Sequence, residues 1–306
     1  MLRLEFHAMG CQMLVAAENE SFYAERRLSE VPSLFADWEQ TLSRFRPDSE
    51  LNRLNDQAGK WVSVSPVIWE VMHIARDAWE QSEGLITPAV LPALESVGYS
   101  QSFELISSGT SDDVAFREKT VQTFQEIKFD EGERCIFLPS GMRLDLGGVA
   151  KGWAAHKAMA HLRDLGPVLM DSGGDIAISA SLKGGEPWAI GVNDPFNRGE
   201  HIESVFVYEG GVATSGQDHR RWQQGAEWRH HIIDPRTGLP AETDLLSVTV
   251  IAENVMKAEM AAKTVLILGS EDGMDWLDHL DNASGLAIME NRELLGSHSI
   301  EKYLRN

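Results

Sequence analysis

Residues 231–238, His-Ile-Ile-Asp-Pro-Arg-Thr-Gly, combine titratable and turn-forming side chains between two apolar, strand-like runs. The Asp-Pro pair favours an extended backbone that opens a turn, and Gly238 permits a positive φ. Because imidazole titrates near neutral pH, His231 is a candidate general base, and strand alternation would turn His230 away from it. Asp234 either orients His231 or caps its own turn as an Asx motif, the role that we favour. An ordinary hairpin turn is the alternative for the whole segment.

A second segment could bind phosphate. Residues 143–152, Arg-Leu-Asp-Leu-Gly-Gly-Val-Ala-Lys-Gly, pass from a strand-like run through a Gly-Gly turn into an expected helix. The first backbone N–H groups of a helix lack internal partners and carry the positive end of its dipole. The turn could therefore hold a phosphate, with Lys151 adding a positive charge. The segment is neither a Walker sequence nor a GxGxxG, and such a turn can also be only a tight connection.

Together and in this order, these segments resemble the ApbE family, the FAD:protein FMN transferases that attach FMN to a threonine of a target flavoprotein through a phosphoester bond. The pair Asp-Leu-Gly-Gly-x-x-Lys-Gly and His-x-x-Asp-Pro-x-Thr-Gly is its most specific part. The resemblance extends along most of the chain. Its collinear motifs lie at residues 9–10, 43–55, 145–152, 171–175, 193–195, 213–216 and 231–238.

The resemblance implies an FAD site. Phe45 stands where the family usually has a tyrosine, and residues 87–92 lack an acidic residue that the family commonly shows there, which would alter adenosine recognition. Without the resemblance, core packing would explain Met9 and Phe45, and a sheet corner would explain Gly173 and Gly174. The implied cofactor contacts are Met9, Phe45, Thr87, Asp145, Lys151, Gly173, Gly174, Thr214, Ser215 and Asp234.

The largest departure from the family lies in residues 255–269. The family's magnesium site uses an Asp and a Thr four residues apart on this helix, and these positions here hold Glu259 and Lys263. The resemblance implies Gly148 and Glu259 as metal ligands, but the ammonium group of Lys263 has no lone pair and would repel Mg²⁺. Two explanations of this substitution remain open, and a third alternative is an ordinary Glu–Lys ion pair on the surface of the helix. Either Lys263 replaces the metal as a catalytic cation, or the chain binds flavin without transferring it.

Composition excludes several classes of function. The 306 residues include 27 Lys and Arg against 47 Asp and Glu, a formal net charge of −20, which argues against binding nucleic acid or an anionic membrane surface. Cys11 and Cys135 form neither a CxxC nor a zinc spacing, so we expect no disulfide framework. We also expect a cytoplasmic location, because we find no leader, lipidation cysteine or long apolar run in the sequence.

The periodicity predicts helices and strands that are mixed but do not alternate regularly, which favours an α+β class over a doubly wound sheet. The resemblance adds a T-fold-related mixed sheet with packed helices and an FAD cleft between two subdomains. We expect one domain over residues 1–306, or two subdomains with a boundary near residue 125. Helices are expected at residues 22–45, 67–81, 149–165, 255–268 and 272–279, and strands at 127–129, 135–138, 168–171, 176–179, 188–192, 204–208 and 246–251.

The resemblance implies transfer of FMN from FAD to a threonine of an acceptor flavoprotein, with release of AMP. FAD is then the substrate, the acceptor flavoprotein is the partner, and a requirement for Mg²⁺ is doubtful. Two rival functions remain. One is an FAD pyrophosphatase, in which water replaces the threonine, and the other is a flavin-binding or delivery protein without catalysis.

Overall fold

The computed structural model describes the chain except residues 107–119, 198, 219, 225–226 and 305–306. Within the described residues, helices occur together with antiparallel strands, which confirms the predicted α+β class. The chain divides into two compact units. The sheet unit comprises Met1–Phe35, Lys151–Asp218 and Glu242–Asn306, and the inserted unit comprises Ala36–Ala150 and His219–Ala241.

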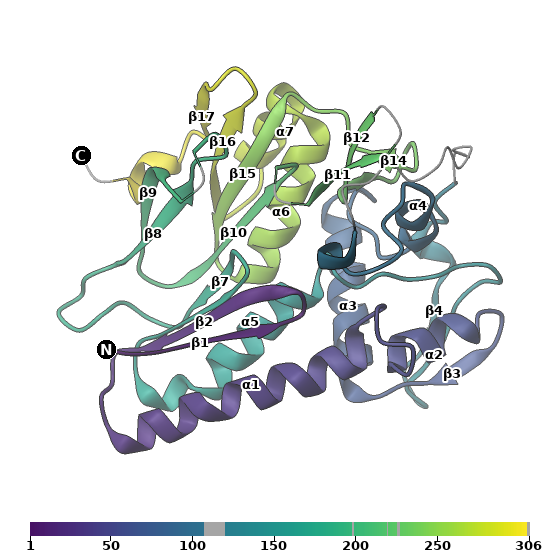
Figure 1. Cartoon of the computed structure of the whole chain (residues 1–306), viewed down its shortest axis with the longest axis horizontal. Helices are drawn as coiled ribbons and strands as arrows, with labels where there is room; N and C mark the ends of the chain where they lie inside the picture. The colour runs from purple at the N-terminus through teal and green to yellow at the C-terminus, as the bar shows by residue number, and fades with distance from the viewer. Residues whose placement is uncertain (107–119, 198, 219, 225–226, 305–306) are drawn as a thin grey trace. The chain divides into compact units, whose positions relative to one another are not determined.

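The sheet unit is built on an eight-stranded sheet in which every neighbouring pair is antiparallel. Its strands follow one another across the sheet in sequence order, but the chain leaves the sheet between β2 and β6, between β7 and β10, and between β10 and β15 (Figure 1). In spatial order the strands are β1 (Leu2–Ala8), β2 (Cys11–Ala17), β6 (Val168–Ser172), β7 (Asp175–Ile178), β10 (Gly210–Gly216), β15 (Leu245–Ala252), β16 (Ala283–Met289) and β17 (Leu294–Gly296).

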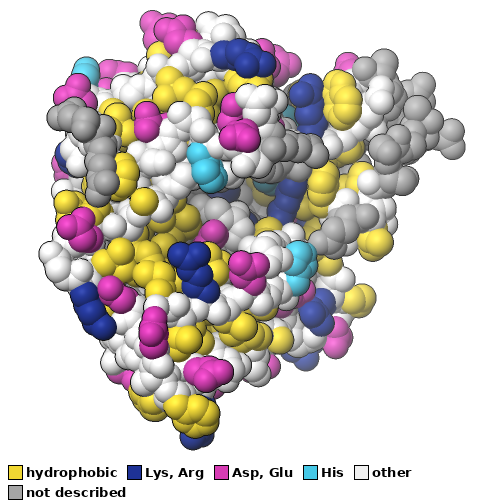
Figure 2. Space-filling model, turned by 60° about the vertical axis from the view of Figure 1, so that its left-hand side comes forward, with side chains coloured by type: hydrophobic (Ala, Val, Ile, Leu, Met, Phe, Trp, Pro, Cys, Tyr) yellow, Lys and Arg dark blue, Asp and Glu magenta, His cyan; other side chains and the backbone are white. Residues whose placement is uncertain are grey.

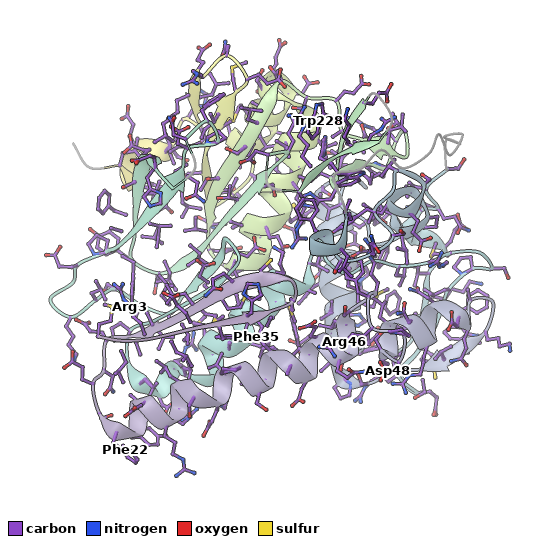
Figure 3. All side chains as sticks on the ribbon, viewed as in Figure 1. Arg3, Phe22, Phe35, Arg46, Asp48 and Trp228 are labelled. Carbon is purple, nitrogen blue, oxygen red and sulfur yellow. The ribbon has the colours of Figure 1, made fainter. Side chains whose placement is uncertain are left out.

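Helices of the sheet unit pack on one face of this sheet. Gly211 of β10 lies so close to the start of α6 that a Cβ atom there would come 2.1 Å from the backbone nitrogen of Val255. From α1, the buried Phe35 meets Phe6 of β1 edge-on at 5.3 Å, whereas Phe22 is 81% exposed and points away (Figure 3). The helices are α1 (Phe22–Leu42), α5 (Ala150–His161), α6 (Val255–Leu268) and α7 (Ser270–Asp278).

The other face of the sheet is covered by the hairpin of β8 (Trp188–Asn193) and β9 (His201–Val207) together with the 3-10 helix η4 (Ile300–Tyr303). Trp188 of the hairpin belongs to the same buried cluster as Ile176 and Val212 of the sheet. Burying each such aliphatic side chain stabilises the fold by about 1.5–3 kcal/mol. Both faces of the sheet are therefore covered, which fixes the strands that carry candidate site residues.

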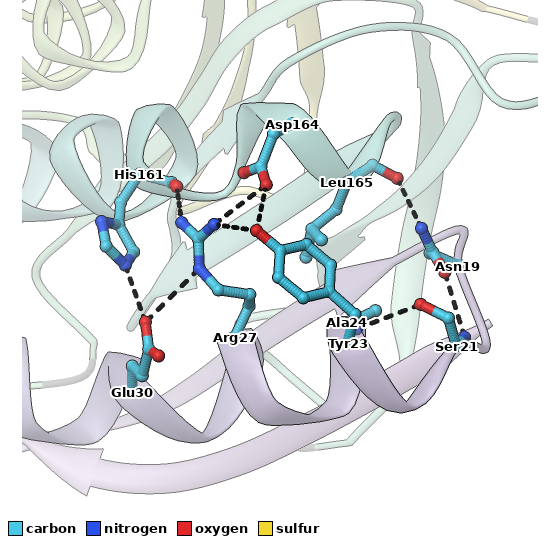
Figure 4. A network of polar contacts seen from close by, with 9 residues as sticks. All are labelled: Asn19, Ser21, Tyr23, Ala24, Arg27, Glu30, His161, Asp164 and Leu165. Atoms are coloured by element: carbon cyan, nitrogen blue, oxygen red, sulfur yellow. Dashed lines mark hydrogen bonds and ion pairs between the residues drawn. The ribbon is translucent and has the colours of Figure 1, made fainter.

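A polar network joins the start of α1 to the end of α5 and the short 3-10 helix η3 (Arg163–Leu165) (Figure 4). Arg27 Nη1 lies 2.9 Å from Asp164 Oδ2, and the hydroxyl of Tyr23 donates to the same oxygen. Arg27 Nη2 also donates to the carbonyl oxygen of His161 at 2.5 Å. The network holds α5, whose first turn carries Lys151, against α1.

The inserted unit contains short helices, a three-stranded sheet and two hairpins. Ser49 and Ser65 cap the first two helices, because each side chain accepts a backbone N–H from the first turn. Pro66 suits the first position of its helix, where no N–H is needed. The helices are α2 (Glu50–Asp56), α3 (Pro66–Gln81) and α4 (Leu91–Ser96), followed by the 3-10 helices η1 (Phe103–Leu105) and η2 (Phe124–Glu126).

Among the described residues of the inserted unit, the strands pair with one another. The sheet has the order β3 (Trp61–Ser63), β5 (Cys135–Phe137), β4 (Lys128–Asp130). The two hairpins lie on either side of His231. They pair β11 (Arg221–Gln224) with β12 (Glu227–His230), and β13 (Ile233–Asp234) with β14 (Leu239–Pro240).

The predicted elements agree with the structure in most positions, with two helices shorter than expected. The helix expected over residues 22–45 ends at Leu42, and the helix expected over 149–165 ends at His161, before Gly166 at φ +97°. Among the described helices, we find none that is long and apolar enough to span a membrane. Figure 2 shows acidic, basic and hydrophobic side chains interspersed on the face it presents.

Candidate active site

Two tight turns lie at the same end of the large sheet. Met9 and Gly10 join β1 to β2 with φ angles of 50° and 66°, and Gly173 and Gly174 join β6 to β7 with 65° and 97°. Because Met13 of β2 pairs with Ser172 of β6, the two turns are neighbours. Positive φ at both central residues matches the twist of tight hairpins.

The backbone is under constraint at both Gly173 and Met9. A Cβ atom on Gly173 would come 2.7 Å from the Cβ of Cys11, closer than two carbon atoms can approach without a shift of one of them. Met9 adopts a left-handed conformation that is uncommon for a residue with a side chain. Strained residues of this kind gather at functional sites.

Thr214 and Ser215 lie at this end of the sheet as well. Ala213 of β10 pairs with Asp175 of β7, so the residues after Ala213 extend towards the Gly173–Gly174 turn. The hydroxyl of Thr214 is hydrogen-bonded to that of Thr249 on the neighbouring strand, at 2.8 Å, while Ser215 is buried. The structure thus gathers five sequence-predicted contacts: Met9, Gly173, Gly174, Thr214 and Ser215.

A cluster of four charges lies beside them on the helix-covered side of the sheet. Lys151, in the first turn of α5, forms an ion pair with Asp175 of β7, and its Nζ is 3.7 Å from Oε1 of Glu259 on α6. Lys263, one turn further along α6, places its Nζ 2.7 Å from the same Oε1. The backbone N–H of Gly152 donates to Oε2 of Glu259 at 3.1 Å. A Cβ on Gly152 would lie 2.6 Å from Oε2, so a larger residue there would have to displace the carboxylate of Glu259.

The two signs of charge in this cluster differ in burial. The side chains of Asp175 and Glu259 are 3% and 2% exposed, whereas those of Lys151 and Lys263 are 17% and 16% exposed. The carboxylates therefore lie underneath, and the exposed part of the cluster belongs to the two lysine side chains. Such a surface suits an anion better than a cation.

The buried position shifts the proton affinities in the cluster. Burial raises the pKa of Glu259, and repulsion from Asp175 adds to this effect against the attraction of Lys263 and Lys151. Burial lowers the pKa of Lys151, but the attraction of Asp175, Glu259 and Cys11 outweighs it, so the pKa lies above its ordinary value. Lys151 accordingly stays charged at neutral pH.

This arrangement does not suit Mg²⁺, which prefers several oxygen ligands. Oε1 of Glu259 faces two ammonium groups, and Oε2 accepts the N–H of Gly152. Gly148, the other expected ligand, lies in the turn before α5. Over the part of the chain that the structure describes, no group of three or more His, Cys, Asp or Glu side chains is arranged to hold a metal ion.

In the inserted unit, Arg44 connects several expected cofactor contacts. Its Nε lies 2.6 Å from Oδ2 of Asp145, and its Nη2 donates to the carbonyl oxygen of Tyr99 at 2.8 Å. The guanidinium lies over the rings of Phe45 and Tyr99, 4.1 and 4.6 Å from their centroids. The backbone N–H of Asp145 donates to the carbonyl oxygen of Pro88, next to Thr87, whose hydroxyl accepts the N–H of Ala89.

Helix α2 explains why Arg44 and Asp145 meet. The Nδ2 of Asn52 donates to the carbonyl oxygens of Arg44 and Arg46 at 2.9 and 2.8 Å, which fixes the turn after α1. One turn later, the buried Asn55 binds both the N–H and the carbonyl oxygen of Leu144. Two asparagines of one short helix thereby hold the backbone on both sides of the ion pair.

His231 and His230 differ in environment. His231 is half-buried, and its ring lies edge-on to Tyr99 with centroids 6.4 Å apart. His230 is buried. Its Nε2 contacts the carbonyl oxygen of Ala241 at 3.1 Å, and its Nδ1 accepts the backbone N–H of Ile232 at 3.3 Å. Burial lowers the pKa of His230, so this side chain is uncharged near neutral pH. Its role is structural, because both ring nitrogens contact the backbone.

Asp234 serves its own turn, which was the favoured prediction. Its Oδ1 accepts the backbone N–H of Arg236 at 2.9 Å, and its carboxylate pairs with the guanidinium of Arg236. Gly238 has φ +71°, as the turn pattern indicated. A direct contact of Asp234 with the cofactor, implied by the resemblance, would have to be made by a carboxylate that Arg236 already engages.

Sequence reasoning missed three residues of these clusters. Arg44 and Asp175 lie inside recognised motifs, so their charge was an available signal. Tyr99 lies outside all of the motifs and gave no signal, although it is buried and contacts Arg44, Phe45 and His231.

Comparison with known proteins assigns the family. A FAD:protein FMN transferase of Treponema pallidum is 29% identical over 319 residues, covering 96% of this chain and 86% of that protein. Another, of Klebsiella pneumoniae, is 28% identical and covers 89% of this chain and 84% of its own length.

Solved structures agree. An ApbE protein of Thermotoga maritima matches with a TM-score of 0.87 at 25% identity, covering 100% of this chain and 99% of that one. The flavin transferase ApbE of Vibrio cholerae has the same fold, with a TM-score of 0.81 at 23% identity and 99% of each chain covered. The model of the ApbE family matches residues 9–288, and this chain therefore belongs to the ApbE family.

Proposed function

We propose that the chain transfers FMN from FAD to a threonine of an acceptor flavoprotein and releases AMP. The observation that carries the proposal is the pair of partly exposed lysine side chains, Lys151 and Lys263, held against buried carboxylates. The pyrophosphate of FAD carries two negative charges and suits such a surface. The similar proteins of Treponema pallidum and Klebsiella pneumoniae, which are FAD:protein FMN transferases, support the same reaction.

The reaction is a displacement at the phosphorus of the FMN half of FAD. A bond forms between the threonine Oγ and this phosphorus, and the bond to the bridging oxygen breaks, so that AMP leaves with that oxygen. His231 accepts the proton of the hydroxyl. Lys151 and Lys263 offset the negative charge that develops on the leaving phosphate.

The remaining candidate residues bind and orient FAD. We assign the tight turns at Met9 and at Gly173–Gly174, with Thr214 and Ser215, to the cofactor contacts made by the end of the large sheet. In the inserted unit, Phe45 is 39% exposed and offers a ring face for flavin or adenine. Asp145, Thr87 and Asp234 order the loops around this ring and His231 by their own hydrogen bonds.

Chromatography of the nucleotide products tests the proposal. The purified protein is incubated with FAD and an acceptor flavoprotein, and AMP is expected to form in an amount equal to the flavin bound to the acceptor. AMP formed together with free FMN would indicate a pyrophosphatase instead. Unchanged FAD, bound to the protein, would indicate a flavin-binding protein without catalysis.

A further inference from the structure

We infer that this chain binds and cleaves FAD without a divalent metal ion, because Lys263 supplies the positive charge that a metal would supply at this place. The inference rests on the proposed function for its substrate, and it adds the identity of the cation. It concerns one position on α6, where the side chain of Lys263 meets Glu259.

The first argument is the occupation of the carboxylate. Oε1 of Glu259 is 2.7 Å from Nζ of Lys263 and 3.7 Å from Nζ of Lys151, and Oε2 accepts the N–H of Gly152. A metal ion could reach Glu259 only by displacing an ammonium group from a carboxylate that is 2% exposed. Separating such a buried pair leaves both charges uncompensated, which is strongly unfavourable.

The second argument is the charge balance. Lys151, Lys263, Asp175 and Glu259 sum to zero before any ligand binds. In the protein without FAD, a dication would give this buried cluster two net positive charges, and the carboxyl group of Asp171, which interacts with Asp175 and Lys151, is poorly suited to balance them. Burial raises the pKa of Asp171, and repulsion from Asp175 adds to this, so ionising it is itself costly.

The third argument is where the positive charge points. The ammonium-bearing side chains are 16% and 17% exposed, while the two carboxylates beneath are almost fully covered. Lys151 also stands in the first turn of α5, where the helix dipole is positive. Two fixed ammonium groups can donate hydrogen bonds to phosphate oxygens without an ion in between.

The test compares FAD binding and cleavage in the presence of a chelator and of added Mg²⁺. Protein freed of metal with EDTA is titrated with FAD, and the binding is followed by the quenching of flavin fluorescence. We expect the Kd to change by less than about twofold when excess Mg²⁺ replaces EDTA, since no charge-assisted contact is gained or lost. The rate of AMP release is expected to be equally insensitive.

Variants of the pair distinguish the role of Lys263 from a structural one. Lys263→Arg keeps the positive charge and should stay independent of metal. The double variant E259Q/K263M removes both charges together, so no unpaired charge stays buried. It should bind FAD about tenfold more weakly, because one charge-assisted contact with the pyrophosphate is lost. The double variant E259D/K263T restores two oxygen ligands and should bind FAD tightly only with Mg²⁺. Thermal unfolding of each variant confirms that it is folded.

The outcomes separate this inference from the proposed function. Loss of FAD binding or AMP release by tenfold or more in EDTA, restored by Mg²⁺, would overturn the inference and leave the proposed function intact. Unchanged FAD affinity in the folded E259Q/K263M variant would also overturn it. Absence of FAD binding under every condition would instead contradict the proposed function.

Discussion

The guanidinium of Arg44 and the carboxylate of Asp145 form a nearly buried ion pair, with Nε and Oδ2 2.6 Å apart and side-chain exposures of 5% and 13%. The other oxygen of Asp145 accepts the N–H of Gly147 at 2.6 Å. Asp145 therefore links the turn that precedes α5 to the turn that follows α1. The pair also sets the guanidinium over Phe45, so the position of this exposed ring depends on it.

Replacing Arg44 by alanine should destabilise the protein by about 3 kcal/mol, because the change leaves the carboxylate of Asp145 nearly buried without its partner. The free energy of unfolding in urea measures this effect. Arg44→Lys keeps a positive charge but loses the planar contact with the rings of Phe45 and Tyr99. Its free energy of unfolding should therefore lie between those of the parent and the alanine variant. An alanine variant as stable as the parent would show that the pair contributes nothing.

His231→Ala should lower the rate of FMN transfer by about 100-fold or more, the usual loss when a general base is removed. FAD affinity should stay the same, because the base acts on the acceptor's hydroxyl. Transfer rates and FAD titrations on the same preparation check both statements. If the variant no longer binds FAD, His231 is a cofactor contact and the assignment of the base is wrong.

His230 should account for part of the loss of stability in acid. Burial lowers the pKa of His230 in the folded protein, so below its ordinary value of 6.5 the unfolded chain takes up this proton more readily. The stabilising effect of the neutral side chain is thus present above 6.5 and lost as the pH falls through the folded pKa. Unfolding free energies measured across this range should fall less steeply for His230→Gln than for the parent.

His279 is the matched control for this effect. It is exposed, and its hydrogen bond to Asp275 raises its pKa, so its contribution has the opposite sign. His279→Gln should leave the acid-induced loss of stability in place. Equal slopes for the parent and His230→Gln would contradict the account of His230.

Gly173→Ala should destabilise the protein more than Gly174→Ala and should weaken FAD binding. Both glycines have positive φ, but a Cβ on Gly173 would meet Cys11 at 2.7 Å, whereas a Cβ on Gly174 has no atom within 4 Å. Alanine at Gly173, with φ +65°, stays in the left-handed region at a cost of about 1 kcal/mol, whereas φ +97° at Gly174 lies beyond it, so a larger loss at Gly173 would come from the clash with Cys11. Unfolding free energies and FAD titrations of the two variants measure it. Equal effects would mean that the turn shifts freely.

Local patterns in the sequence were sufficient for several elements and for one contact. The helical spacing of residues 67–81 and the start signal Ser65-Pro66 identify α3. The four-residue spacing of Glu259 and Lys263 places both on one face of α6, and the structure has them paired. By contrast, β1 and β2 were not predicted, although Leu2, Leu4 and Phe6 of β1 alternate with polar residues as in a half-buried strand.

Long-range arrangement was beyond the sequence. Lys151 meets Asp175 and Glu259 only because α5 and α6 cross on the sheet beside β7. The sheet order in which β10 lies between β7 and β15 has no local signature. Tyr99 approaches Arg44 and His231 from a segment without a motif, so only the fold shows that these side chains are neighbours.

The mass of the acceptor after reaction tests the central claim most directly. An acceptor flavoprotein is incubated with this protein and FAD, next to a control in which the target threonine is changed to alanine. We predict that the acceptor gains one FMN in phosphoester linkage at that threonine, that the control gains none, and that AMP appears in equal amount. An acceptor of unchanged mass, with FAD either intact or cleaved to free FMN and AMP, would contradict the transfer of FMN to protein.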